Sequence, residues 1–303
     1  MNKFYTNKQQ IINWLDEYKI KKYTLVQDEQ YGFIVNVNGE VDLGNKKLLS
    51  IPIKFSEVTG GFYCNDNKIA SLEFSPKTVG GFYCNDNKLT SLEFSPKTIG
   101  GDFYCNYNQL TSLEFSPTTV GGYFDCSNNQ LTSLEFSPQN IGGVFSCSCN
   151  KLNSLEFSPQ TVGLSFDCSN NKLTSLKFSP QKVVGSFSCY LNQLTSLEFS
   201  PQTVGDYFDC SNNQLTSLEF SPQKVSGDFS CSYNQLTSLE FFPQAVGGNF
   251  YCENNPELNK IQKITDFKLI YLEHKKVLIA KLSDKLNNDL VSYNSKRTAK
   301  IKI

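Results

Sequence analysis

A unit of 20 or 21 residues recurs about ten times along this chain of 303 residues, and that period constrains the fold more than any other feature. Each unit has one Cys at the same place and an Asn three residues after it. Units of this length stack into solenoids, because a single unit cannot bury its apolar face alone. The two series are Cys64, Cys84, Cys105, Cys126, Cys147, Cys168, Cys189, Cys210, Cys231 and Cys252, and Asn67, Asn87, Asn108, Asn129, Asn150, Asn171, Asn192, Asn213, Asn234 and Asn255.

Within each unit, the residues ahead of the Asn alternate between inward and outward positions. In Phe82-Tyr83-Cys84 the order is in, out, in, which predicts a short strand. Strands at the same place in successive coils predict a parallel sheet with one strand per coil, spaced by about 4.8 Å. The Asn lies where the chain turns, and its amide can satisfy backbone groups of neighbouring coils.

The second half of each unit is the return path of the coil. Apolar side chains are expected to fill it, and in one unit they are Leu89, Leu92, Phe94, Pro96 and Ile99. The return path is predicted to be extended rather than helical, because its residues alternate and its Pro would stop a helix. Gly-Gly pairs precede most strands, and we expect them to permit a tight corner.

These positions match the pattern L-x-x-L-x-L-x-x-N-x-L. In the unit that starts at Val79, the pattern positions are Val79, Phe82, Cys84, Asn87 and Leu89. The segment from about residue 37 to residue 258 therefore resembles the leucine-rich-repeat family, in its short bacterial subtype. The S-L-E-F-S-P tail of the unit is similar to the S-L-P-x-L-P tail of secreted bacterial repeat effectors. The chain departs from those effectors by using Cys and Phe, as uncharacterised bacterial and phage repeat proteins do.

The resemblance implies a leucine-rich-repeat solenoid with a parallel sheet on its concave face and an extended convex side. It also implies a non-catalytic protein-interaction module that recognises a partner protein on the concave face. Two alternatives stay open: an effector that is delivered to or acts in a host cell, and a purely structural repeat protein. A monomer is expected.

The two ends of the array differ from its middle, and both are expected to be helical caps. Within residues 7–20, apolar side chains recur at helical spacing, which predicts an amphipathic helix. Residues 23–26 and 33–37 are predicted to be short strands. Residues 264–290 are rich in Leu and Lys and are expected to be helical. The predicted division is an N-terminal helix, strands and degenerate capping coil over 1–57, the array over 58–258, and a C-terminal helical cap with a basic tail over 259–303.

Charge and cysteine content narrow the class of protein. The net charge is −1, and residues 58–252 carry 9 basic and 16 acidic groups, so neither nucleic acid nor membrane is expected as a partner. One Cys per unit suggests small buried side chains rather than disulfides. No signal-peptide pattern opens the chain. We therefore expect free thiols and a reducing compartment, the cytoplasm, or the host cytoplasm for an effector.

The outward residue between Phe and Cys defines the candidate binding surface. The middle of this series alternates Asp and Ser, whereas three successive Tyr occupy one end. Tyr is favoured at interfaces because it offers a large rigid area with a polar tip. Two interpretations remain open, a binding surface and cross-strand stabilisation of the sheet. The candidate partner-binding residues are Tyr63, Tyr83, Tyr104, Tyr107, Tyr123, Asp125, Asp167, Asp209 and Tyr251.

A second acidic series follows the return path in the motif L-E-F. It is interpreted as a solvated charged row, with an acidic strip for a basic partner as the alternative. Its members are Glu73, Glu93, Glu114, Glu135, Glu156, Glu198, Glu219 and Glu240, with Lys177 in the sixth place.

Catalysis and metal binding are not expected. The outward Asp residues lie two coils apart, about 10 Å by sheet spacing, which is too far for one ion to bridge. Cys149 stands outside the Cys series and neither adjacent residue is cationic, and His274 is the chain's single His. No phosphate-binding or zinc motif is present, so no cofactor is predicted and the chain is expected not to be an enzyme.

Overall fold

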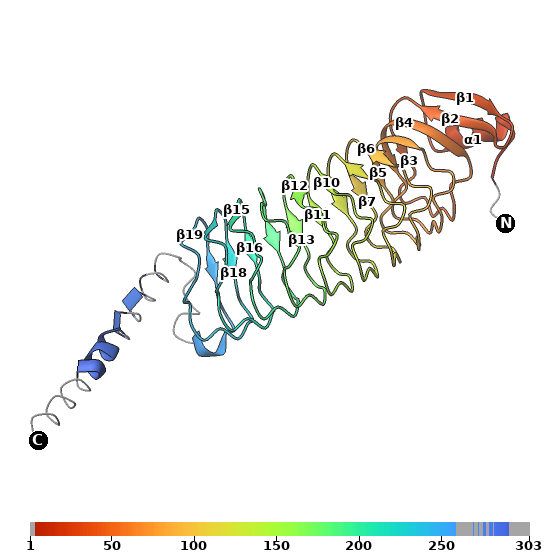
Figure 1. Cartoon of the computed structure of the whole chain (residues 1–303). Helices are drawn as coiled ribbons and strands as arrows, with labels where there is room; N and C mark the ends of the chain where they lie inside the picture. Colours follow the sequence, from red (N-terminus) through yellow and green to blue (C-terminus); the bar gives the residue numbers. More distant parts are fainter. Residues whose placement is uncertain are drawn as a thin grey trace, which may run out of the picture.

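The computed structural model describes residues 4–258 and, beyond them, positions 269, 272, 275, 276, 279, 280 and 282–290. Coils of about 21 residues stack into an elongated parallel β-solenoid, with a small mixed unit at the N-terminal end (Figure 1). The predicted fold class is confirmed. Among the described residues, no helix is long and apolar enough to cross a membrane.

The N-terminal unit joins one helix and a hairpin to the first coil. Helix α1 (Lys8–Glu17) starts at Asn7, whose side chain accepts hydrogen bonds from the backbone of its first turn. Its buried face packs into the same core as the array. Strands β1 (Tyr23–Asp28) and β2 (Gly32–Val37) pair antiparallel, and β2 also runs parallel to β4 (Lys54–Tyr63). The array therefore continues the sheet of this unit.

Each coil of the array contributes to two parallel ladders of strand pairs. Strands β4 and β5 (Thr78–Tyr83) pass through both ladders without a break, while β3 (Val41–Asp42) pairs with the end of β4. From residue 98 onward the strand divides, so a second short strand accompanies the predicted one. The first ladder comprises β6 (Thr98–Ile99), β8 (Thr119–Val120), β10 (Asn140–Ile141), β12 (Thr161–Val162), β15 (Thr203–Val204), β17 (Lys224–Val225) and β19 (Ala245–Val246).

The second ladder carries the predicted Phe-x-Cys strands. It pairs coil to coil in register, Phe opposite Phe. We call the surface formed by its outward side chains the strand face; it is the predicted concave face. Its strands after β5 are β7 (Phe103–Tyr104), β9 (Phe124–Asp125), β11 (Phe145–Ser146), β13 (Phe166–Asp167), β14 (Phe187–Ser188), β16 (Phe208–Asp209), β18 (Phe229–Ser230) and β20 (Phe250–Tyr251), and a 3₁₀ turn, η1 (Pro256–Leu258), follows the last coil.

The core is a set of stacked identical side chains. The Phe rings from Phe62 to Phe250 form one continuous stack, with neighbouring centroids 5.1 to 5.9 Å apart. The ten register Cys are buried beside them as free thiols. Burial raises the pKa of the thiols, to about 12 for Cys64. These Cys therefore act as small apolar residues, as the sequence predicts.

The Asn ladder joins the coils through backbone hydrogen bonds. The Asn108 side-chain nitrogen donates to the carbonyls of Cys84 in the preceding coil and of Cys105 in its own, at 3.0 and 3.1 Å. Its side-chain oxygen accepts from the amide of Leu89 at 2.9 Å. The same pattern recurs at the other Asn positions, which confirms the predicted role of this residue.

One part of the predicted return path is wrong. Leu89, Leu92 and Ile99 are buried as expected, but Phe94 is 48% exposed. The Ser95 amide donates to the Leu92 carbonyl at 2.9 Å, which closes a β-turn that points Phe94 outward. The prediction failed because simple alternation assumes an extended chain, whereas this turn reverses the direction of one side chain.

The Gly-Gly corners serve close approach rather than unusual backbone angles. A Cβ on Gly121 would lie 2.1 Å from the Gly100 carbonyl oxygen, and one on Gly142 would lie 2.0 Å from that of Gly121. Neither glycine has a positive φ. Their missing side chains let successive coils stack without a gap, which corrects the expected reason for the pairs.

Candidate functional site: the strand face

The three predicted tyrosines form a continuous aromatic stack on the strand face. Strands β4, β5 and β7 present Tyr63, Tyr83 and Tyr104 in register. Ring centroids are 4.5 Å apart between Tyr63 and Tyr83, and 5.3 Å apart between Tyr83 and Tyr104, with nearly parallel planes. All three are half-buried, so each ring keeps a surface that a partner can contact.

Asp102 is the acidic neighbour of this stack. Its carboxylate accepts a hydrogen bond from the Tyr83 hydroxyl at 3.3 Å and one from the Tyr123 amide at 2.9 Å. Burial, the Asp102 charge and the neighbouring Tyr63 raise the pKa of Tyr83 to about 12. Burial, Asp102 and Asp125 likewise raise the pKa of Tyr104. The surface therefore combines stacked aromatic rings with a carboxylate that is hydrogen-bonded to one of them.

A hollow of about 450 Å³ adjoins the N-terminal end of the stack. Glu40, Asp42, Gly44, Tyr63 and Asn65 line it. Two carboxylates at one end and Asp102 at the other thus flank the Tyr stack. This arrangement suits a cation, because an ammonium or guanidinium group can stack on a ring and pair with a carboxylate.

The predicted Asp residues lie further along the same face, separated by serines. Asp125 pairs across to Ser146, which pairs to Asp167, so each carboxylate has a Ser as its neighbour in the next coil. Asp125, Asp167 and Asp209 each accept a hydrogen bond from the backbone amide two residues later. Burial raises the pKa of Asp125 despite the opposing hydrogen bonds from Ser127. In the part of the chain that is described, no three His, Cys, Asp or Glu residues group to hold a metal ion.

The other three predicted residues are not part of the Tyr stack. Tyr107 lies in the turn after β7, with φ 51° and 54% of its side chain exposed. Tyr123 is exposed beside Asp125, on the position that precedes the core Phe. Tyr251 lies at the opposite end of the array, where its hydroxyl accepts from the Asn249 side chain at 3.1 Å.

Several residues of this surface were missed from the sequence. Asp102 and Tyr207 occupy the position before the core Phe, which also faces outward. Strict alternation around Phe would have identified this second outward row. Glu40 and Asp42 come from the degenerate first coil, and no repeat signal marks them. Burial and the charges of Asp167, Asp209 and Asp206 raise the pKa of Tyr207, so a second acidic cluster surrounds this ring.

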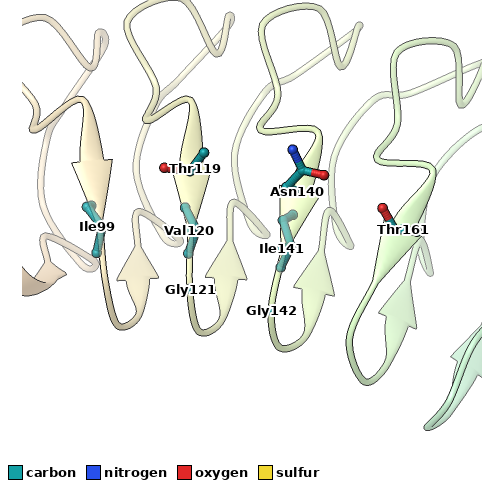
Figure 2. Close-up of a pocket in the computed structure, with 8 residues that line it drawn as sticks. All are labelled: Ile99, Thr119, Val120, Gly121, Asn140, Ile141, Gly142 and Thr161. Atoms are coloured by element: carbon teal, nitrogen blue, oxygen red, sulfur yellow. The ribbon is translucent and has the colours of Figure 1, made fainter.

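A further hollow, of about 400 Å³, runs along the first ladder (Figure 2). Its walls are Thr119, Asn140 and Thr161 beside Gly121 and Gly142, with buried Ile99, Val120 and Ile141 below. None of these lining residues is titratable, so the hollow has no charged group with which to bind a ligand.

Cys149 has a definite place in the repeat. It has φ 54° and occupies the turn position that Tyr107 and Asn128 occupy in other coils. It is half-buried, and its sulfur accepts a hydrogen bond from the Asn170 side chain at 3.2 Å. The residue is thus one of several that the turn accommodates.

The coil length, the parallel ladders and the Asn ladder fit the leucine-rich-repeat type of β-solenoid. Among solved structures, the chain is similar to YopM from Yersinia enterocolitica WA-314, with a TM-score of 0.51 and 22% sequence identity. The match covers 72% of this chain and 54% of YopM, so the chain spans about half the length of that protein. No protein-family model and no curated protein sequence matches the chain. The Cys and Phe variant of the repeat is therefore without a matching family description.

Proposed function

We propose that the chain is a non-catalytic protein-interaction scaffold that binds a basic segment of a partner protein on its strand face. The stacked Tyr63, Tyr83 and Tyr104 are the observation that carries this proposal. They form a rigid aromatic surface of the kind found at binding hot spots. Asp102 and the hollow lined by Glu40 and Asp42 add negative charge at both sides of the stack.

Variation among the coils supports the same surface. The inward positions repeat Phe, Cys, Asn and Leu with little change, because each must stack on its neighbour. The outward strand positions between Phe and Cys change from Tyr to Asp and Ser along the array. Positions free to vary while the core repeats are those at which a scaffold can acquire specificity.

The charge of the array argues against nucleic acid as the partner. Residues 58–252 carry nine basic and sixteen acidic side chains, and phosphate would be repelled. The eleven free cysteines support a reducing compartment such as the cytoplasm.

The test is selection of displayed peptides against the full chain, followed by calorimetric titration of the selected peptide. Changing Tyr63, Tyr83 and Tyr104 to Ser, the residue of other coils at this position, should weaken binding by about 2 kcal/mol or more, roughly 30-fold. The matched control changes Tyr190 to Ser and Tyr233 to Asn, which other coils carry at those places.

Unchanged affinity in the triple variant, with unchanged melting, would move the site away from the stack. A drop in melting temperature with no loss of affinity would mean that the tyrosines stabilise the sheet, which is the structural alternative.

A further inference from the structure

Eight phenylalanines form an exposed row on the return side of the array, which we call the Phe ladder. One projects from each of eight successive coils, and each residue is 40 to 54% exposed. All eight have φ between 66° and 72°. They are Phe94, Phe115, Phe136, Phe157, Phe178, Phe199, Phe220 and Phe241.

The turn that presents these rings is unfavourable for Phe. In the turn Leu92–Ser95, only the third residue, Phe94, has a positive φ, as in a type II turn. That position favours Gly or Asn, because a Cβ crowds the backbone there. A strained backbone that holds a large apolar ring in solvent in coil after coil points to a binding role rather than a folding role.

The exposed area is large enough for an interface. A Phe side chain has a surface of about 200 Å², and nearly half of each is exposed. The eight rings together therefore expose about 750 Å² of apolar surface. A standard interface buries about 800 Å² per partner, and the largest apolar patch of a typical monomer is smaller than this.

The chain itself shows what covers such a ring. Phe74, at the same place in the first full coil, is only 8% exposed and has no positive φ. Phe4 and Tyr31 of the N-terminal unit pack on it, with centroids 5.3 and 5.8 Å away. The Lys54 ammonium, 5.9 Å from the Tyr31 ring, donates to the carbonyl of Glu73 at 3.3 Å. The occupant of this place therefore combines large apolar side chains with a cation.

The exposed rings of the ladder also attract cations. Lys97 lies over the ring of Phe115 at 5.5 Å, and Lys177 lies over that of Phe178 at 5.0 Å. An exposed Glu precedes each ring except Phe178, which Lys177 precedes. The ladder is thus an apolar strip edged by carboxylates.

One segment of this chain has the complementary chemistry. Residues 259–303 carry eleven basic and four acidic side chains, against nine basic and sixteen acidic in 58–252. Every described residue of this segment is helical and exposed. Six of its apolar residues are 51 to 64% exposed to solvent: Leu269, Leu272, Ile279, Leu282, Leu286 and Leu290.

We propose that the C-terminal segment of one copy docks on the Phe ladder of a second copy, and that the exchange is reciprocal. The helix expected over 264–290 would be about 40 Å long, and the ladder extends at least about 34 Å over seven coil spacings. The described helical residues lie beyond the last coil and not alongside the array (Figure 1). Reciprocal docking closes a two-fold dimer, in place of the monomer expected from the sequence.

The experiment is sedimentation velocity of the full chain over a range of concentrations. The ladder variant changes Phe136, Phe157 and Phe199 to Asn, which tolerates the left-handed backbone. The tail variant changes Leu282, Leu286 and Leu290 to Asn. The matched control for the ladder variant changes the exposed Thr132, Thr174 and Thr195 to Asn. Another coil already carries Asn at this position, as Asn153.

The proposal expects a monomer–dimer equilibrium that the ladder and tail variants each weaken at least tenfold and the control leaves unchanged. Raising the salt from 0.05 to 0.5 M should weaken it as well, because the contact is between opposite charges. The variant with Ser at positions 63, 83 and 104 should dimerise normally, which separates this proposal from the proposed function.

A full chain that stays monomeric at all concentrations overturns the proposal. That result includes the case in which the tail docks on its own ladder, which hydrogen exchange at the ladder turns would detect. A dimer that persists in the ladder variant, with circular dichroism unchanged, overturns it as well.

Discussion

Replacing Asn129 with Ala tests whether the Asn ladder holds the coils together. The Asn129 side-chain nitrogen donates to the carbonyls of Cys105, Cys126 and Ser127, each at 3.1 Å. Its side-chain oxygen accepts from the Leu110 amide at 2.9 Å. Only 8% of the residue is exposed, so water can replace these bonds only in part.

The expected loss follows from the groups left without partners. A buried polar group that loses its hydrogen bond costs about 1 to 3 kcal/mol, and the Leu110 amide and the carbonyls of two coils are affected. Partial access of water at the edge of the turn reduces the total to about 3 to 5 kcal/mol. The neighbouring Asn128 has φ 53° and makes one side-chain hydrogen bond, to the Ser127 hydroxyl at 3.2 Å. Its change to Ala should cost only about 1 kcal/mol, for Ala in a left-handed conformation.

Urea unfolding of the two full-length variants, followed by far-UV circular dichroism, measures the difference. Hydrogen exchange of the Leu110 amide adds a local measurement, since a solenoid can open one coil at a time. Equal unfolding midpoints for the two variants, or an unchanged exchange rate at Leu110, would refute the argument that the ladder bridges the coils.

Three further outcomes are expected. Phe242 replaces the Ser of other coils, and its ring centroid lies 6.3 Å from that of Phe250. Changing Phe242 to Ser should lower the free energy of unfolding by about 2 kcal/mol, because apolar area is no longer buried, and should speed hydrogen exchange in the last coil. Unchanged exchange would show that Phe242 does not cap the array. In native protein, only Cys149 should react quickly with a maleimide, with eleven thiols reacting after denaturation, because burial raises the pKa of the others; several disulfides by mass spectrometry would contradict this. Changing Asp125 to Asn should raise the melting temperature at pH 7, because burial raises the pKa of this carboxyl and so disfavours its charged form. The gain should shrink as the pH falls and the wild-type carboxyl becomes protonated, and a gain independent of pH would contradict the reasoning.

Much of the fold could be predicted from the sequence because the signal repeats. A single Phe-Tyr-Cys triplet is weak evidence for a strand, but the same spacing over ten units leaves little choice of register. The inward positions, the Asn role and the buried Cys all follow from one rule, that identical side chains stack on their neighbours. The Tyr stack at residues 63, 83 and 104 follows from the same rule, and the structure places these rings in contact.

The tertiary structure alone decided where the exposed Phe residues point. Phe74 and Phe94 occupy the same sequence context, S-L-E-F-S-P, yet one is buried and the other is open to solvent. The difference lies in Phe4 and Tyr31, which are far away in sequence and cover only the first of the two rings. Asp102 and Glu40 likewise join the Tyr stack through stacking of coils rather than through any motif. Periodicity determines which residues share a row, because it is a local property of the chain. Which row meets solvent, and which is covered, depends on non-local packing between coils and ends that no single repeat contains.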